Sequence, residues 1–153
     1  MSTDAATLSN IVVANHILAN EEVVDAFGHI SFRHPDDPEK YLLSRARAPE
    51  LIEADDIVTY RLDGEAINAG DRRPYSERMI HGAIYEQRPD VNVVIHNHSY
   101  EVIPFASTGT PLRPVTHTCA PIGGNIPVWD MRDKFGENNH LVVTMEQGRL
   151  LPP

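Results

Sequence analysis

The chain has 153 residues and a formal net charge of −9, from 13 Lys and Arg against 22 Asp and Glu. This acidic balance excludes proteins that bind nucleic acids or anionic membranes, because both partners require a basic surface. Hydrophobic residues make up 41% of the chain and charged residues 23%, as in soluble globular proteins, and we expect residues 1–153 to form a single domain. The single cysteine, Cys119, excludes an internal disulfide and favours a cytoplasmic protein.

The first part of the chain predicts one helix followed by three short strands. Apolar residues that recur near a 3.6-residue period predict a helix over residues 4–19. Alternating apolar and polar residues predict a strand at 29–33 and a returning strand at 41–44. A run rich in β-branched residues predicts a third strand at 57–61.

The middle of the chain predicts a helix that leads into a strand. Apolar residues at helical spacing predict the helix over residues 74–87, and a β-branched run predicts the strand over 91–98. Successive side chains of a strand point to opposite faces. We therefore expect one face of this strand to carry two histidines and the other to be a buried apolar face, made by Val91, Val93 and Ile95.

The last part of the chain holds weaker signals. Residues 126–129 and 141–143 are apolar runs of strand length, and Thr144 with Gln147 has the form of a capping box that opens a helix. The chain stops at Pro153, less than two helical turns later, so the end looks interrupted. Helices that alternate with short strands predict a layered α/β or α+β domain.

The sharpest local signal for chemistry is His96-Asn97-His98. On a strand, residues at i and i+2 project from the same face, so both imidazoles can converge on one metal ion. Neutral imidazole is a ligand for zinc and other first-row divalent metals. The alternative is a pair of polar residues at an exposed strand end.

Two residues on the preceding helix accompany this pair. Glu77 and His81 are four apart, so they share a helix face. A carboxylate next to a two-histidine site is a further metal ligand or a general acid/base, while the alternative for Glu77 is a solvated carboxylate in the first helical turn. For His81 we prefer a hydrogen-bonded core or helix-surface histidine.

Three segments together resemble the class II aldolase/adducin family. They are residues 75–81 (Tyr-Ser-Glu-Arg-Met-Ile-His), 88–90 (Arg-Pro-Asp) and 94–98 (Val-Ile-His-Asn-His), and residues 28–33 are similar to the family's Gly-Asn-x-Ser-x-Arg segment. The resemblance implies an α/β fold, an αβα-layered domain around a central, mostly antiparallel sheet. It also implies a homo-oligomer, usually a tetramer, with its sites at subunit interfaces.

The resemblance further implies a divalent metal ion held by three histidines. By position, His96 and His98 would be two metal ligands and Glu77 the catalytic acid/base. Zinc is the first expectation, with manganese or magnesium as alternatives. The family's third metal histidine lies beyond the helix that begins near Thr144, and this chain ends before it. We therefore expect a domain that is C-terminally truncated and lacks the family's last third.

The substrate positions differ from those of the family's sugar-phosphate aldolases. Those enzymes bind phosphate with an Asn, a Thr-Gly pair and a Ser-Ser pair, whereas this chain carries, at the matching places, His29, Arg45, Arg47 and Ser76. Planar guanidinium forks suit a carboxylate, although a solvated basic loop is the alternative for each arginine. The resemblance therefore argues against a phosphorylated sugar as the substrate.

These substitutions, with residues 111–117, resemble the family branch of decarboxylases that act on hydroxylated aromatic or related carboxylic acids. This branch implies His117 near the substrate, with a polar strand-end residue as the alternative. We predict a metal-dependent carbon–carbon lyase that decarboxylates such a small-molecule acid through a metal-stabilised enolate. The alternatives are an aldolase acting on a non-phosphorylated hydroxy-keto substrate and a non-catalytic, adducin-like or degenerate assembly domain.

Overall fold

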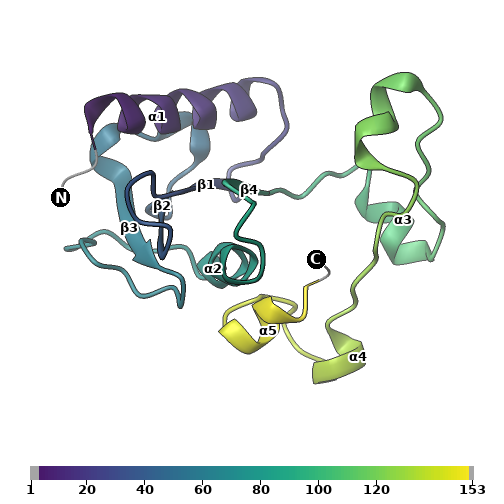
Figure 1. Ribbon diagram of the computed structural model, residues 1–153. Coiled ribbons are helices and arrows are strands. Elements are labelled where there is room, and N and C mark those ends of the chain that lie inside the picture. Colours follow the sequence, from purple (N-terminus) through teal and green to yellow (C-terminus); the bar gives the residue numbers. More distant parts are fainter. Residues whose placement is uncertain (1–3, 152–153) are drawn as a thin grey trace.

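A four-stranded antiparallel sheet lies at the centre of the computed structural model, which describes residues 4–151 (Figure 1). The strand order is β3-β2-β1-β4, and the strands are β1 (His29–Arg33), β2 (Lys40–Ser44), β3 (Ile57–Arg61) and β4 (Val93–His96). The prediction of strands at 29–33 and 57–61 is confirmed, and β2 begins one residue before its predicted start. Residues 152–153, which the expected interruption at the C-terminus concerns, lie outside the described residues.

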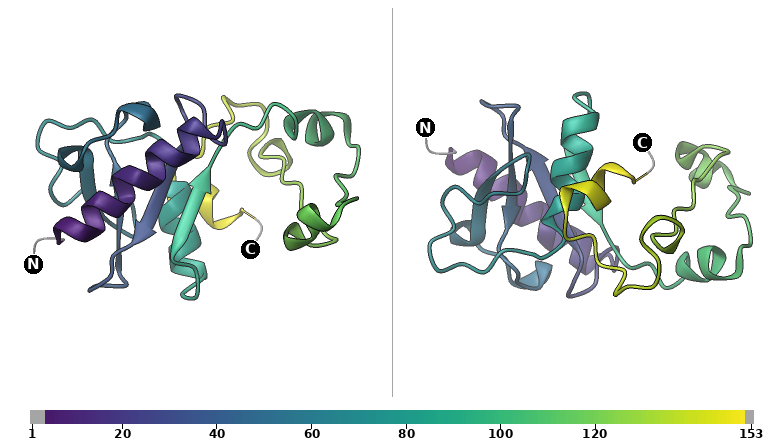
Figure 2. Two further views of the ribbon diagram at one scale, coloured as in Figure 1. Left: turned by 90° about the horizontal axis from the view of Figure 1, so that it is seen from above. Right: turned by 90° about the horizontal axis from the view of Figure 1, so that it is seen from below.

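Helices cover both faces of this sheet, so the predicted αβα layering is confirmed (Figures 1 and 2). Helix α1 (Ala5–Asn20) lies over one face, and its N-terminus is capped by the Asp4 carboxylate, which accepts hydrogen bonds from the backbone N–H groups of Ala6 and Thr7 at 2.9 Å. Helix α2 (Arg78–Gln87) lies over the other face. Successive side chains of β2 point to opposite faces of the sheet, so neighbouring residues enter different hydrophobic clusters. On the α1 side, Leu42 packs with Ile11, Ile52 and Ile57. On the α2 side, Leu43 packs with Tyr41, Val58, Tyr85 and Val94.

Helix α2 begins at Arg78, so the prediction that it starts at residue 74 is wrong. The backbone of Pro74 forms an isolated antiparallel bridge with Arg45, and the Ala46 N–H donates to the Arg73 carbonyl at 2.8 Å. This extended pairing holds residues 73–74 beside the chain that leaves β2 and is incompatible with a helix there. As a result, Ser76 and Glu77 precede the helix and face the loop after β2.

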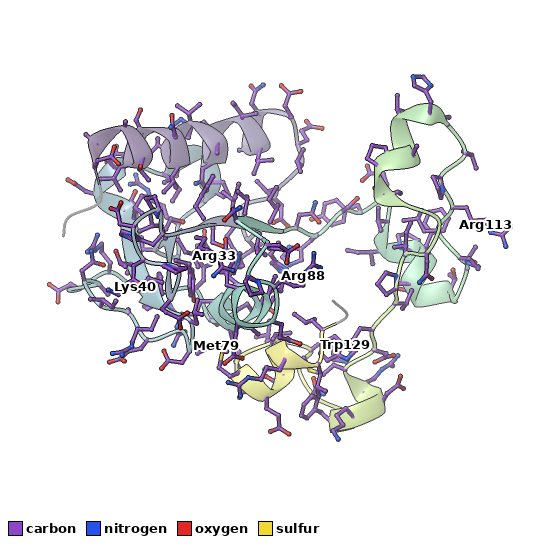
Figure 3. The ribbon with its side chains drawn as sticks, in the orientation of Figure 1. Arg33, Lys40, Met79, Arg88, Arg113 and Trp129 are labelled. Carbon is purple, nitrogen blue, oxygen red and sulfur yellow. The ribbon has the colours of Figure 1, made fainter. Side chains whose placement is uncertain are left out.

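Arg33 fixes the connection between α2 and β4. Its guanidinium donates to the backbone carbonyls of Tyr85, Arg88 and Val91 at 2.9–3.0 Å, where the helix ends and the chain turns back into the sheet. Figure 3 shows Arg33 and Arg88 near this end of α2. The first residue of β1 and the last of β4 are thereby held in one register, with His29 directly opposite His96.

Strand β4 is shorter than the predicted 91–98, and the prediction of a buried face made by Val91, Val93 and Ile95 is wrong. The side chains of Val93 and Ile95 are 43% and 46% exposed, whereas Val94 is buried. The cause is the position of β4 at the edge of the sheet, where Val93 and Ile95 remain exposed on the face turned away from α2. The buried face of β4 is the one that packs toward α2.

The chain after β4 runs into an extended arm, defined here as residues 97–130, which includes α3 (Ile103–Thr108) and the 3₁₀ helix η3 (His117–Ile122). From residue 95 to residue 130 no side chain is buried. The apolar runs at 126–129 and 141–143 form no strand, because the structure places no partner strand beside them. Figure 1 shows the arm standing apart from the sheet.

Two short helices bring the chain back to α2. They are α4 (Arg132–Phe135) and α5 (Met145–Arg149), and α5 packs directly against α2. The predicted capping box at Thr144 is confirmed, since its hydroxyl accepts from the Gln147 N–H at 3.2 Å and the Gln147 side chain accepts from the Thr144 N–H at 3.0 Å. The remaining 3₁₀ helices are η1 (Pro49–Leu51) and η2 (Ala54–Asp56), and no helix within residues 4–151 is long and apolar enough to cross a membrane.

Candidate active site

Two histidines meet at the edge of the sheet. His96 is the last residue of β4, and the Nε2 atoms of His96 and His98 lie 3.1 Å apart. Burial lowers the pKa of His96 more than the nearby Glu77 carboxylate raises it, so the ring is neutral at pH 7. Two imidazoles whose Nε2 atoms lie this close together are able to bind one metal ion.

Glu77 approaches the same point from the N-terminus of α2. Its Oε2 lies 3.6 Å from His96 Nε2, and its Oε1 accepts a hydrogen bond from the Val142 N–H at 3.1 Å. The side chain is only 14% exposed. The segment before α5 therefore holds one oxygen of this carboxylate and leaves the other directed at the histidines.

His29 lies beside the pair because β1 and β4 are adjacent. The ring centroids of His29 and His96 are 4.8 Å apart, and His29 is 2% exposed. Burial, with the neighbouring rings of His81 and His96, lowers the pKa of His29 well below its ordinary value. The metal-binding atoms offered by His29, Glu77 and His96 all lie within 4.8 Å of one another, so the described residues include a donor cluster that fits a divalent cation.

A cavity of about 540 Å³ opens onto this cluster. Five of the residues singled out from the sequence line it, namely His29, Arg47, Ser76, Glu77 and His98. Arg73 also lines it, a residue that sequence reasoning missed although it directly precedes Pro74 and the 75–81 segment. The lining of the cavity thus combines two arginines, Arg47 and Arg73, with carboxylate and imidazole donors.

Two of the predicted substrate-binding residues lie elsewhere. Arg45 is absent from the cavity wall, and its guanidinium is paired with Asp56, the carboxylate that also accepts from Arg47 at 2.7 Å. His117 is exposed on the arm, and in Figure 3 the nearby Arg113 points outward from the arm, away from the sheet. Within this chain, residues 111–117 do not reach the cavity, so the role of His117 stays a prediction.

Asp25 is a further residue that sequence reasoning missed. Its carboxylate accepts a hydrogen bond from His98 Nδ1 at 3.1 Å, and the backbone N–H groups of Phe27 and Gly28 also donate to it at 2.9 and 2.8 Å. Burial alone would raise the pKa of Asp25, but these hydrogen bonds lower it. A proton fixed on Nδ1 leaves the Nε2 lone pair of His98 free for a metal. No sequence pattern links residues 25 and 98, which only the fold brings together.

Asp25→Asn is expected to weaken metal binding by about 10- to 100-fold while leaving the fold intact, because an amide holds the His98 ring less firmly than a carboxylate. The measurement is competition for Zn²⁺ against a chromophoric chelator, with circular dichroism as the check on folding. Asp37→Asn, at the remote turn where Asp37 pairs with Lys40, is the matched control. Wild-type affinity in Asp25→Asn would show that Asp25 only shapes its own loop.

Comparison with known proteins places this site in a family. The Class II Aldolase and Adducin N-terminal domain family matches residues 9–149, and the chain belongs to this family. It is 36% identical to decarboxylase tropJ of Talaromyces stipitatus, over 81% of this chain and 47% of that protein. It is 34% identical to a 3,4-dihydroxyphthalate decarboxylase of Arthrobacter keyseri, over 94% of this chain and 62% of that protein.

A solved structure confirms the fold. The L-fuculose 1-phosphate aldolase from Glaciozyma antarctica superposes with a TM-score of 0.67 at 28% identity, covering 75% of this chain and 49% of that one. The expected class II aldolase fold is therefore confirmed. The chain spans between 47% and 62% of the length of these three relatives.

Proposed function

We propose that this protein is a metal-dependent lyase that decarboxylates a hydroxylated aromatic or related carboxylic acid. The observation that carries the proposal is the cavity that Glu77 and His98 line together with Arg47 and Arg73. Similarity to two decarboxylases supports this reaction over the aldol cleavage of other relatives. We further propose a cytoplasmic homo-oligomer, which the exposed apolar side chains of the arm support.

His96 and His98 would hold the metal, with Glu77 beside them. Zinc is the first choice, because imidazole and carboxylate are its usual ligands in catalytic sites, and manganese or magnesium remain alternatives. When bound, the ion supplies Lewis acidity that stabilises negative charge on the substrate oxygens.

The chain's own residues perform the remaining tasks. Arg47, with Arg73 beside it, binds and orients the carboxylate, and Ser76 offers a hydroxyl on the same wall. When the bond to the carboxylate carbon breaks, its electron pair stays on the substrate and CO₂ leaves. Glu77 Oε2, the oxygen not held by Val142, is placed to move a proton to the carbon that lost CO₂.

The direct test is CO₂ release from a panel of hydroxylated aromatic acids, with Zn²⁺, Mn²⁺ or Mg²⁺ added. Each acid is paired with the analogue that lacks its hydroxyl groups. We expect CO₂ and the corresponding phenol from at least one hydroxylated acid in the presence of metal. Absence of CO₂ from every acid would contradict the proposal, and an aldehyde released from a non-phosphorylated hydroxy-keto compound would establish the aldolase alternative.

Arg47→Gln is expected to lower kcat/KM for the acid by about 10- to 100-fold, mostly through KM, because a charged hydrogen bond to the substrate carboxylate is lost. Arg45→Gln is the matched control, since it loses the same partner, Asp56, without lying on the cavity wall. Steady-state kinetics and metal content are measured for both variants. Equal losses in the two variants would show that Asp56 pairing, and not substrate binding, is what matters.

A further inference from the structure

A chain of buried polar side chains runs from the sheet to the site. The Tyr85 hydroxyl oxygen lies 2.8 Å from Ser31 Oγ, and Ser31 Oγ lies 2.6 Å from His81 Nδ1. His81 Nε2 in turn lies 2.6 Å from His29 Nδ1. All four residues are at most 2% exposed. The preference for His81 as a hydrogen-bonded core histidine is thus confirmed, and its two partners connect the core to His29.

The protons of this chain run in one direction, from Tyr85 toward the site. The Tyr85 hydroxyl has two acceptors near it, Ser31 Oγ at 2.8 Å and the Asn92 backbone carbonyl at 3.5 Å. Only the first lies within the usual range for a hydroxyl donor and an oxygen acceptor, about 2.5–3.0 Å. The Asn92 carbonyl already accepts from the Arg33 N–H at 2.8 Å. Tyr85 therefore donates to Ser31, and the Ser31 hydroxyl donates to His81 Nδ1.

This direction sets the tautomers of both histidines. Burial lowers the pKa of His81 to about 3, so its ring is neutral and has one donor and one acceptor nitrogen. Because Nδ1 of His81 accepts from Ser31, its proton is on Nε2, which donates to His29 Nδ1. The His29 ring accepts at Nδ1 and therefore carries its own proton on Nε2.

His29 Nε2–H is a hydrogen-bond donor at the cavity. His29 lines the cavity, and among residues 4–151 no hydrogen bond engages its Nε2. The ring is held on two sides, since its centroid lies 4.4 Å from that of Tyr75 and 4.8 Å from that of His96. A donor fixed in a buried wall is preorganised to stabilise negative charge on a substrate oxygen.

We propose that His29 donates through Nε2–H to the substrate oxygen on which negative charge collects as CO₂ leaves, and that a buried relay fixes this tautomer. The relay consists of three positioning residues, His81, Ser31 and Tyr85. This inference rests on the proposed decarboxylation, and it deepens the prediction that His29 binds substrate by naming the atom, its proton and the charge that it meets.

The proton of His29 stays in place throughout the reaction. The electron pair of the broken carbon–carbon bond is delocalised onto the substrate oxygen, where the Nε2–H stabilises it, and it returns to carbon when Glu77 delivers a proton there. A nitrogen that carries a proton in neutral imidazole has no lone pair for a metal ion. His29 therefore serves the substrate, although it lies beside His96.

The first test needs no substrate and uses the wild-type chain with ¹⁵N-labelled histidine. In imidazole spectra, we expect His29 and His81 to carry their protons on Nε2, and the His29 proton to remain on addition of Zn²⁺. The His29→Asn variant assigns the signals, because it lacks one set. Ser31→Ala is expected to mix the tautomers of both rings, because the hydroxyl that orders them is lost. A proton on His29 Nδ1, or loss of the Nε2 proton with Zn²⁺, would overturn the inference.

The second test separates kcat from KM and from metal affinity. His29→Leu, which has no donor, is expected to lower kcat by about 10²- to 10³-fold, with KM little changed and with wild-type affinity for Zn²⁺ in chelator competition. His29→Asn, whose amide offers N–H donors, should recover at least about 10-fold of this loss. Tyr85→Phe is expected to lower kcat by about 10-fold. Tyr60→Phe is its matched control, since the buried Tyr60 hydroxyl has no hydrogen-bond partner among the described residues.

The two tests distinguish failure of this inference from failure of the proposed function. Release of CO₂ with a wild-type kcat in His29→Leu would overturn the inference alone. A loss of Zn²⁺ affinity above about 100-fold in that variant would also overturn it, because the loss would mark His29 as a metal ligand. Wild-type protein that shows the expected tautomers but releases no CO₂ from any acid would overturn the proposed function and, with it, the donor role.

Discussion

Glu77→Gln is expected to lower kcat by about 10²- to 10⁴-fold, the range for removal of a general acid/base, while the protein still binds metal. The substitution is nearly isosteric, and the amide oxygen can keep the hydrogen bond from the Val142 N–H. The atom that changes function is Oε2, which lies 3.6 Å from His96 Nε2 and loses its ability to accept and release a proton. The measurement combines kcat on the best acid of the panel with metal content by elemental analysis.

Glu86→Gln is the matched control for this experiment. Glu86 lies on α2, the helix that Glu77 precedes, and pairs with Arg149 at the surface, at 2.6 Å. We expect it to leave kcat unchanged, because a surface ion pair contributes about 0–1 kcal/mol to stability and nothing to the site. If Glu77→Gln retained the wild-type rate, Glu77 would be a structural cap on the Val142 segment, and the acid/base would have to be sought elsewhere in the cavity.

The double variant His96→Ala/His98→Ala is expected to lose metal binding by more than about 10³-fold and to lose activity with it, because each lost ligand costs more than a supporting residue does. The Nε2 atoms of His96 and His98 lie 3.1 Å apart, so the double variant removes both imidazoles that meet at the proposed metal position. Isothermal titration with Zn²⁺ and the CO₂ assay report the two losses.

The matched double control is His16→Gln/His140→Asn. Neither residue lines the cavity, and Asn tolerates the positive φ of 59° at position 140. This variant should bind one equivalent of metal and turn over as wild type. Catalysis that survived the loss of His96 and His98 would contradict the metal-dependent reaction, whereas metal binding without any reaction in the wild type would favour the non-catalytic alternative.

The parts of the fold that could be predicted are those set by local signals. Strand alternation at 29–33, the run at 57–61 and the Thr144–Gln147 capping box each depend on residues within a few positions of one another. The start of α2 could not be predicted, because the pairing of Pro74 with Arg45 overrides a helical pattern. The exposed side chains of Val93 and Ile95 likewise follow from the place of β4 in the strand order, which periodicity does not encode.

The candidate site, like the fold, could be predicted only where its residues lie close together in the sequence. The spacing of His96 and His98, with Glu77 shortly before them in the sequence, indicates a metal-binding cluster from sequence alone. The contacts of Asp25 with His98 and of His81 with His29 span 73 and 52 positions, so only the tertiary structure reveals them. Arg45 and Arg47 are separated by a single residue, yet the common pairing with Asp56 leaves only Arg47 at the cavity.

The register between β1 and β4 has a consequence for the local stability of the sheet at this edge. His96 stands directly opposite His29, and β4 is an edge strand paired on one side only. A shift of one residue would turn His96 to the opposite face. A metal ion that binds only the native register would therefore stabilise it, by a free energy that grows with the logarithm of the metal concentration above Kd. Amide hydrogen exchange in β4 should slow on addition of metal, while exchange in β3, at the other edge, should not change.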